Sequence, residues 1–171
     1  MDHEELLHTL LESLGVDHEP GTREGETVVT LPGERKLRTV VSLLLGDRAV
    51  SLRAFVIRNA DENHEEFYRY LLRRALRLPG LAYAVDGAGD VYVTGRLPLA
   101  GLDEDSLDEL LGGVLAAADE PFNDLLRLGF WTSIQREWQW RVSRGESTAN
   151  LEAFRAELEG GPIGLEHEQR R

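Results

Sequence analysis

Three stretches of the chain carry apolar residues at the three- and four-residue spacing that is typical of an amphipathic helix. The first ends before Gly15, the second follows the N-cap candidate Asn63, and the third follows the N-cap candidate Asp103. Glu66 completes a capping-box pattern for the second helix, which we expect to end at Pro79-Gly80. The sequence therefore predicts three well-marked helices.

Five shorter runs predict the strands of an antiparallel sheet, with glycine-containing hairpin turns after the second and the fourth run. The runs are Glu26–Leu31, Leu37–Leu45, Ala49–Arg58, Ala82–Asp86 and Val91–Gly95. In the third run Leu52 and Ala54 alternate with Phe55 and Ile57, so both faces carry apolar residues. We therefore expect a cover on each face of the sheet, from helices on both sides or from a partner subunit.

The predicted elements follow the order α-β-β-β-α-β-β-α, which indicates an α+β protein with a five-stranded antiparallel sheet packed by helices. The 171 residues, 42% hydrophobic and 29% charged, match the size and composition of one globular domain. We expect this domain to span residues 1–160, with its core at about 26–158 and a linker at Val16–Gly25. Residues 161–171 are expected to form a flexible tail.

The pattern of the C-terminal third is helical but interrupted. Pro121 predicts that the third helix kinks or restarts, and Gly129 indicates its end or a hinge. Phe130–Val142 is expected to be helical again. Ser147 is a candidate cap for a last helix that ends near Glu159.

Charge and composition exclude several classes of function. The net charge of −12 argues against binding to the phosphate backbone of nucleic acid. The chain has no cysteine, which excludes disulfides, thiolate zinc sites and cysteine nucleophiles. The first residues are acidic, unlike those of a signal peptide, and no apolar run approaches the ~20 residues of a membrane span. We therefore expect a cytoplasmic protein that binds neither nucleic acid nor membrane.

Residues with catalytic or metal-binding chemistry form no recognisable motif. His3 and His8 stand five residues apart, whereas two histidines of a helical zinc site stand four apart. Asp86 and Asp90 lie at the second predicted hairpin, where carboxylates stabilise turns but can also serve acid–base catalysis or bind a divalent cation. We expect no catalytic residue, no metal and no cofactor. The alternative is a small metal-dependent or acid–base enzyme that uses these acids and those near His64.

Two groups of residues are candidates for binding a partner. The basic face of the second predicted helix consists of Arg69, Arg73, Arg74 and Arg77. Arginine pairs well with carboxylates, so this face suits an acidic peptide or a partner subunit, unless it is a solvated face that pairs with nearby acids. The aromatic group consists of Trp131, Trp138 and Trp140. Such a group is typical of interface hot spots, although it can also pack its helix onto the sheet.

Three segments resemble a known family. They are residues 58–99 (RNADENHEEFYRYLLRRALRLPGLAYAVDGAGDVYVTGRLPL), 119–130 (DEPFNDLLRLGF) and 136–155 (REWQWRVSRGESTANLEAFR). These segments are similar to the YbjN domain of actinobacteria, and the resemblance covers roughly Thr27 to Glu157. The family is described as bacterial regulators of sensory transduction. Its fold resembles the type III secretion chaperones, dimeric α+β proteins that hold extended peptide segments.

The resemblance supplies no catalytic residues, and a fold by itself does not determine function. Together with the residues above, it leads us to expect a non-enzymatic, chaperone-like or regulatory protein. We expect a homodimer that captures a protein partner or peptide segment in a stress or sensory-transduction pathway. The alternatives are the small enzyme described above and a structural subunit of a larger complex.

Overall fold

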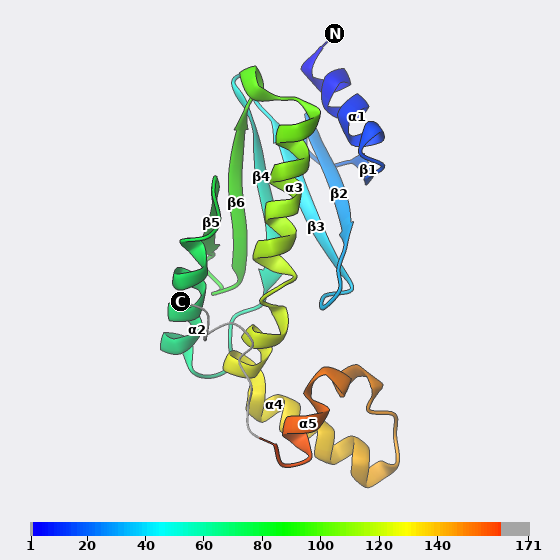
Figure 1. Cartoon of the computed structure of the whole chain (residues 1–171), viewed down its shortest axis with the longest axis vertical. Coiled ribbons are helices and arrows are strands. Elements are labelled where there is room, and N and C mark those ends of the chain that lie inside the picture. The colour runs from blue at the N-terminus through cyan, green and yellow to red at the C-terminus, as the bar shows by residue number, and fades with distance from the viewer. Residues whose placement is uncertain (1, 162–171) are drawn as a thin grey trace. The chain divides into compact units, whose positions relative to one another are not determined.

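The computed structural model describes residues 2–161, whose contacts group into two compact units (Figure 1). The sheet unit comprises the chain up to Asn59 together with Tyr68–Phe122. The helical unit comprises Ala60–Phe67 together with the chain from Asn123 onward. The single domain expected from the sequence stays a prediction, and the expected tail lies outside the described residues except for Gly161.

The sheet unit contains a six-stranded sheet with the order β1-β2-β3-β4-β6-β5, in which every pair of neighbours is antiparallel. The strands are β1 (Asp17–Pro20), β2 (Glu26–Pro32), β3 (Arg38–Leu45), β4 (Ala49–Ile57), β5 (Leu81–Val85) and β6 (Val91–Pro98). The helices are α1 (His3–Ser13), α2 (His64–Ala75) and α3 (Glu104–Ala118), of which α2 begins in the helical unit. The short 3₁₀ helix η1 (Leu99–Gly101) precedes α3.

One face of the sheet forms the main core. Helix α3 runs along this face and packs against β4 and β6, and α1 packs against α3 and β1 (Figure 1). Val29, Val41 and Val93 on the strands and Leu107 and Val114 on the helix are fully buried. The alternating burial along β2, β3 and β4 follows from the two-residue period of a strand with one covered face.

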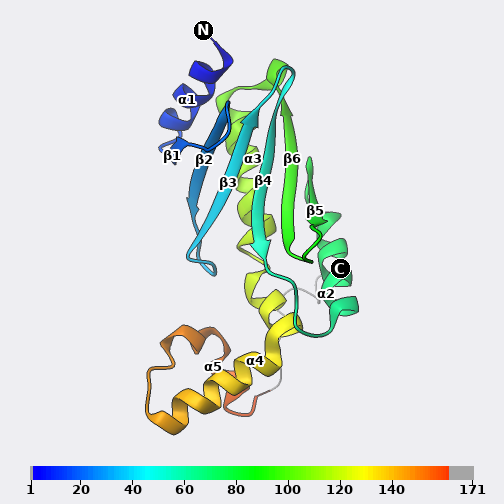
Figure 2. The ribbon, with the colours of Figure 1, turned by 180° about the vertical axis from the view of Figure 1, so that it is seen from behind.

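The opposite face, here called the open face, is exposed. Figure 2 shows β3, β4 and β6 from this side, with α3 behind them. Val40 and Phe55 on this face are 44% and 40% exposed. Within the sheet unit, the expectation that helices lie on both sides of the sheet is wrong, because α1 and α3 lie on the same face. A partner as the second cover stays a prediction.

The predicted sheet of five strands is also corrected. The segment expected to be a linker contains β1, whose residues pair with β2 from Asp17↔Thr30 to Pro20↔Thr27. β1 has no apolar alternation, because its sequence is DHEP and its side chains are mostly exposed. Its strand conformation comes from backbone pairing with β2, for which the side chains give no signal.

The helical unit contains α4 (Phe122–Arg144), the 3₁₀ helix η2 (Ala149–Phe154) and α5 (Arg155–Leu158). The predicted restart at Pro121 is confirmed, because α3 ends at Ala118 and α4 begins at Phe122. The predicted end or hinge at Gly129 is wrong, since α4 continues through it. A Cβ at this position would lie 2.8 Å from the Cβ of Ala60 and 2.9 Å from the ring of Phe67, so Gly129 permits close packing inside the unit.

A buried ion-pair cluster joins α4 to the end of the described chain. Arg127 pairs with Asp124 at 3.3 Å and with Glu157 at 2.9 Å, and its guanidinium also donates to the carbonyl of Ala153 at 3.2 Å. The side chains of Arg127, Asp124 and Glu157 are only 6%, 2% and 9% exposed. This cluster holds η2 and α5 against α4, where the sequence predicted a single last helix.

Candidate functional site

The loop between β2 and β3 is fixed by a buried carboxylate. Asp119 follows the last turn of α3, and its side chain accepts three backbone N–H groups of this loop. The donors are Glu34 and Arg35, both at 3.1 Å, and Lys36 at 2.8 Å. Loop backbone that would otherwise need water is therefore satisfied by one side chain.

Lys36 connects the same loop to the end of β4. Its ammonium donates to the carbonyls of Phe55 at 2.8 Å and Val56 at 3.0 Å. Burial lowers the pKa of Lys36, and the charge of Asp119 partly offsets this effect. The following residue, Leu37, is 91% exposed, so the loop presents an apolar side chain next to β3.

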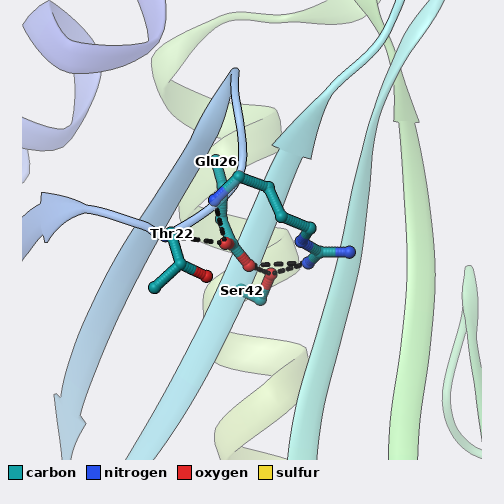
Figure 3. Close-up of polar contacts among 4 residues, drawn as sticks. Thr22, Glu26 and Ser42 are labelled. Carbon is teal, nitrogen blue, oxygen red and sulfur yellow. Dashed lines mark hydrogen bonds and ion pairs between the residues drawn. The ribbon is translucent and has the colours of Figure 1, made fainter.

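The turn between β1 and β2 is held by Glu26, as Figure 3 shows. Its carboxylate accepts the backbone N–H groups of Thr22 and Arg23 at 3.1 and 3.2 Å, together with the Arg23 guanidinium and the Ser42 hydroxyl. Hydrogen bonds from the Arg23 guanidinium and from Ser42 lower the pKa of Glu26 to about 2. The negative charge of Glu26 is therefore neutralised within the turn.

The predicted arginine face of α2 separates into two groups. The Arg74 guanidinium donates to the Ala116 carbonyl at 2.7 Å and pairs with Glu120 at 3.1 Å, and its side chain is only 16% exposed. Nearby, the Tyr83 hydroxyl donates to the Ala117 carbonyl at 2.7 Å. Arg74 thus satisfies the C-terminal end of α3 and has a structural role. Arg69, Arg73 and Arg77 are exposed.

Two exposed leucines lie beside the exposed arginines. Leu72 is 69% exposed on the side of α2 that carries Arg69 and Arg73, and Leu76, in the turn that directly follows the helix, is 89% exposed. We call these four residues the α2 stripe. Leu72 is one of the apolar residues at helical spacing in the second predicted helix, so a buried position was expected for it, but it is exposed. Only the tertiary structure distinguishes it from the buried Leu71 beside it.

The sheet edge formed by β5 is also unusual. Its sequence LAYAV has no charge and no proline, and Val85 is 48% exposed. Natural edge strands commonly carry charge or proline, which block pairing with another chain, as the opposite edge strand β1 does. The α2 stripe and the β5 edge belong to the same unit and offer apolar contact and unpaired backbone.

The three tryptophans all lie on α4 in the helical unit. The ring of Trp131 meets that of Phe154 edge-on at 6.3 Å, and the guanidinium of Arg155 lies 5.8 Å from the Trp138 ring. Trp140 is 48% exposed, with Val142 and Arg144 nearby on the same exposed end of the helix. The tryptophans and the arginines therefore belong to different compact units.

The carboxylates at the second hairpin stabilise the turn. Asp86 accepts the N–H groups of Ala88 at 2.9 Å and Asp90 at 3.0 Å, and Asp90 accepts the N–H of Asn59 at 2.8 Å. Within residues 2–161, no three histidine, aspartate or glutamate side chains are grouped closely enough to hold a metal ion. These contacts are those of a turn, and the enzyme alternative stays a prediction.

The model of the YbjN family, described as "Putative bacterial sensory transduction regulator", matches residues 3–127. The chain belongs to the YbjN family. The match begins before Thr27, where the resemblance was expected to start, and ends before the segment 136–155. Over 135 residues the chain is 53% identical to the uncharacterized protein Mb0497 of Mycobacterium bovis, which covers 79% of this chain and 74% of that protein.

Three solved structures share the fold of this YbjN protein. The ExsC–ExsE complex has a TM-score of 0.52 at 22% identity and covers 71% of this chain and 92% of the matched chain. The Yersinia pestis type III secretion chaperone SycH, solved with a stable fragment of YscM2, has a TM-score of 0.51 at 19% identity. The match covers 68% of this chain and 97% of the matched chain. YbjN from E. coli has a TM-score of 0.51 at 12% identity, and the match covers 69% of this chain and 89% of the matched chain. The predicted α+β, type III secretion chaperone-like fold is confirmed.

No helix among residues 2–161 has the length and apolar character needed to cross a bilayer.

Proposed function

We propose that this YbjN protein is a non-enzymatic, chaperone-like regulatory module that works as a homodimer and captures a protein partner. The observation that carries the proposal is the α2 stripe, where two leucines are 69% and 89% exposed beside two arginines. Exposed apolar side chains gathered on one surface typically mark a contact with another protein. Aromatic residues and arginine are the types most enriched at such contacts.

The fold relatives support protein capture. The structure of ExsC is that of a complex with ExsE, and SycH was solved with a stable fragment of YscM2. Both structures are complexes with another protein, and from them we propose that this chain also binds a protein partner. The cytoplasmic location and the stress or sensory pathway stay predictions from the sequence.

The α2 stripe and the β5 edge are the proposed homodimer surface. Helix α2 is acidic in its first turn, at Glu65 and Glu66, and carries the exposed Arg73 in its last turn. Two copies of α2 that pack antiparallel about a two-fold axis bring unlike charges together and bury the leucines of both copies. The unpaired β5 edges allow additional backbone pairing.

Sedimentation equilibrium tests the dimer. We expect the wild type to be a dimer and Leu72→Asp/Leu76→Asp to be a folded monomer, because two exposed leucines would be replaced by charge. Leu37→Asp, which changes an equally exposed leucine on the β2–β3 loop, is the matched control and should remain dimeric. A wild type that sediments as a monomer contradicts the homodimer.

The exposed Trp140, together with Trp131 and Trp138 on the same helix α4, is the proposed contact for the captured protein in the helical unit. Tagged protein purified gently from its native cells should retain a partner that Trp140→Ala releases. Trp131→Ala and Trp138→Ala are expected to act less directly, because these rings already contact Phe154 and Arg155. Arg69→Glu/Arg73→Glu tests the basic side of α2 and avoids the structural Arg74.

If Trp140→Ala and Arg69→Glu/Arg73→Glu are folded and still retain the same partners as the wild type, Trp140 and the arginines of α2 are not the contacts for the captured protein. Clean recovery of the protein alone would contradict the capture function itself. Permanent co-purification in fixed stoichiometry would instead support the alternative of a structural subunit.

A further inference from the structure

The open face of the sheet combines apolar and cationic side chains on its central strands. Strand register places alternate residues of β2, β3, β4 and β6 on this face. Its apolar members are Val28, Val40, Leu44, Phe55 and Tyr92. One row across the sheet runs Ser42–Arg53–Thr94 and the next Leu44–Ser51–Arg96, so polar and apolar positions are interleaved.

On strands β3, β4 and β6 this face carries arginines and no carboxylate, a charge opposite to that of the whole chain. Arg38, Arg53 and Arg96 are exposed there, and none of them pairs with a carboxylate within residues 2–161. Strands β3, β4 and β6 direct no carboxylate to this face; its carboxylates are Glu26, which is already bound by Arg23, and Asp17 and Glu19 on the edge strand β1. In a chain of net charge −12, three arginines gathered on β3, β4 and β6 without a carboxylate partner favour a binding partner that carries negative charge at this part of the face.

The aromatic geometry argues for carboxylates rather than nucleic acid. The Arg53 guanidinium lies 4.0 Å from the centre of the Tyr92 ring and covers one face of it. Phe55 meets Tyr92 edge to face, with the ring centres 5.6 Å apart and an angle of 76° between the rings. Base stacking needs open and roughly parallel ring faces, which this arrangement does not offer. A guanidinium stacked on a ring still presents its N–H groups to a carboxylate.

The backbone of the sheet decides the conformation of the partner. A strand laid on the face of a sheet finds no backbone donor or acceptor there, because the sheet uses these groups within its own plane. Its own N–H and C=O groups would be buried without partners, which is costly. A helix satisfies its backbone internally and packs flat on a sheet, as α3 does on the opposite face.

We infer that the open face binds an amphipathic helix of a partner protein, with an apolar stripe flanked by glutamate or aspartate. The apolar stripe packs on Val40, Leu44 and Phe55, and the flanking carboxylates pair with Arg53 and the two other arginines of the face. The inference rests on the proposed function, protein capture, and names the chemistry of the captured segment. It assigns a surface other than the α2 stripe and the tryptophans.

Synthetic peptides provide the probe. One fluorescein-labelled peptide has a leucine and phenylalanine stripe at helical spacing, flanked by glutamate. A second has the same stripe flanked by lysine, and a third probe is a labelled single-stranded oligouridine. Binding to the full chain is measured by fluorescence anisotropy at low and high salt. NMR amide shifts, followed during the titration, report where each probe binds.

We expect the glutamate peptide to bind at least about tenfold more tightly than the lysine peptide, a difference of about 1.4 kcal/mol. Its binding should weaken with salt and shift the amides of Ser42, Arg53 and Thr94. Arg53→Glu should weaken it by about tenfold, whereas the control Arg48→Glu, in the β3–β4 turn, should change it by less than about twofold. Circular dichroism confirms that both variants are folded.

Equal binding of the two peptides, equal effects of the two variants or preferential binding of oligouridine would each overturn the inference. So would a dimer that Arg53→Glu dissociates, since a second copy would then be the cover of this face. A protein that still captures a native partner through Trp140 but ignores the glutamate peptide would overturn this inference alone. The proposed function would then remain standing.

Discussion

Replacement of Asp119 by alanine tests the strongest single anchor in the sheet unit. The side chain is 6% exposed and accepts three backbone N–H groups of residues 34–36. Alanine leaves these donors without their acceptor and removes the negative charge that faces Lys36. The end of α3 and the β2–β3 loop would then lose their main polar connection.

The expected magnitude follows from the number and exposure of the three bonds. A hydrogen bond to a charged group contributes about 1.5–3 kcal/mol. The exposed Glu34 and the half-exposed Arg35 can recover part of this from water, so their bonds count for less. We expect Asp119→Ala to lower the free energy of unfolding by about 3 kcal/mol, or the Tm by about 6–12 °C. Asp119→Asn, which keeps one acceptor oxygen, should lose about half of this.

Urea unfolding gives the free energies, and amide hydrogen exchange shows where protection is lost. Asp108→Ala is the matched control, because Asp108 lies exposed on the same helix, and it should change stability by less than about 0.5 kcal/mol. In Asp119→Ala the amides of residues 34–36 should exchange faster than the global stability requires. Equal stability of the two alanine variants, or unchanged exchange at residues 34–36, would refute the reasoning.

Three further predictions concern other parts of the chain. Arg127→Met should destabilise the helical unit by about 3–5 kcal/mol, because two buried carboxylates lose their cation; limited proteolysis should then cut near η2 much faster than in the wild type. The hydrogen-bonded ion pair with Arg23 lowers the pKa of Glu26 from 4.5 to about 2. The contribution of the ionised Glu26 to the stability of the fold is therefore complete above about pH 4.5 and is lost as the pH falls through 2. The stability difference between wild type and Glu26→Gln should therefore shrink over this range in acid unfolding curves, and a constant difference would contradict it. Gly129→Ala should cost about 1–3 kcal/mol in thermal unfolding, since its Cβ would lie 2.9 Å from Phe67; a neutral effect would show that the contact relaxes.

Local chemistry made much of the fold predictable. The capping residue Asp103 accepts the Ser106 N–H at 2.8 Å at the start of α3, as its sequence position indicates. The break at Pro121 is also where the sequence predicted it, because proline lacks the N–H that a helix interior requires. Signals of this kind act between neighbouring residues and can be seen without a structure.

The errors have a common cause in contacts between distant residues. β1 exists because β2 offers it a free edge, and α4 continues through Gly129 because Ala60 and Phe67 need the space that a side chain would fill. The candidate surfaces show the same limit. The four similar arginines on and just after α2 could not be divided into buried and exposed until the position of Arg74 against the end of α3 was known.

The sequence by itself determined the α+β class, most element boundaries, the family and the absence of thiol chemistry. It did so because periodicity, capping and turn residues act over a few positions of the chain. Only the tertiary structure decided which apolar residues remain exposed and which charges are paired. Leu71 is buried and its neighbour Leu72 is exposed. Arg74 is paired with Glu120, whereas Arg53 lies on the uncovered face of the sheet. Burial and pairing differ in this way because they depend on residues far along the chain.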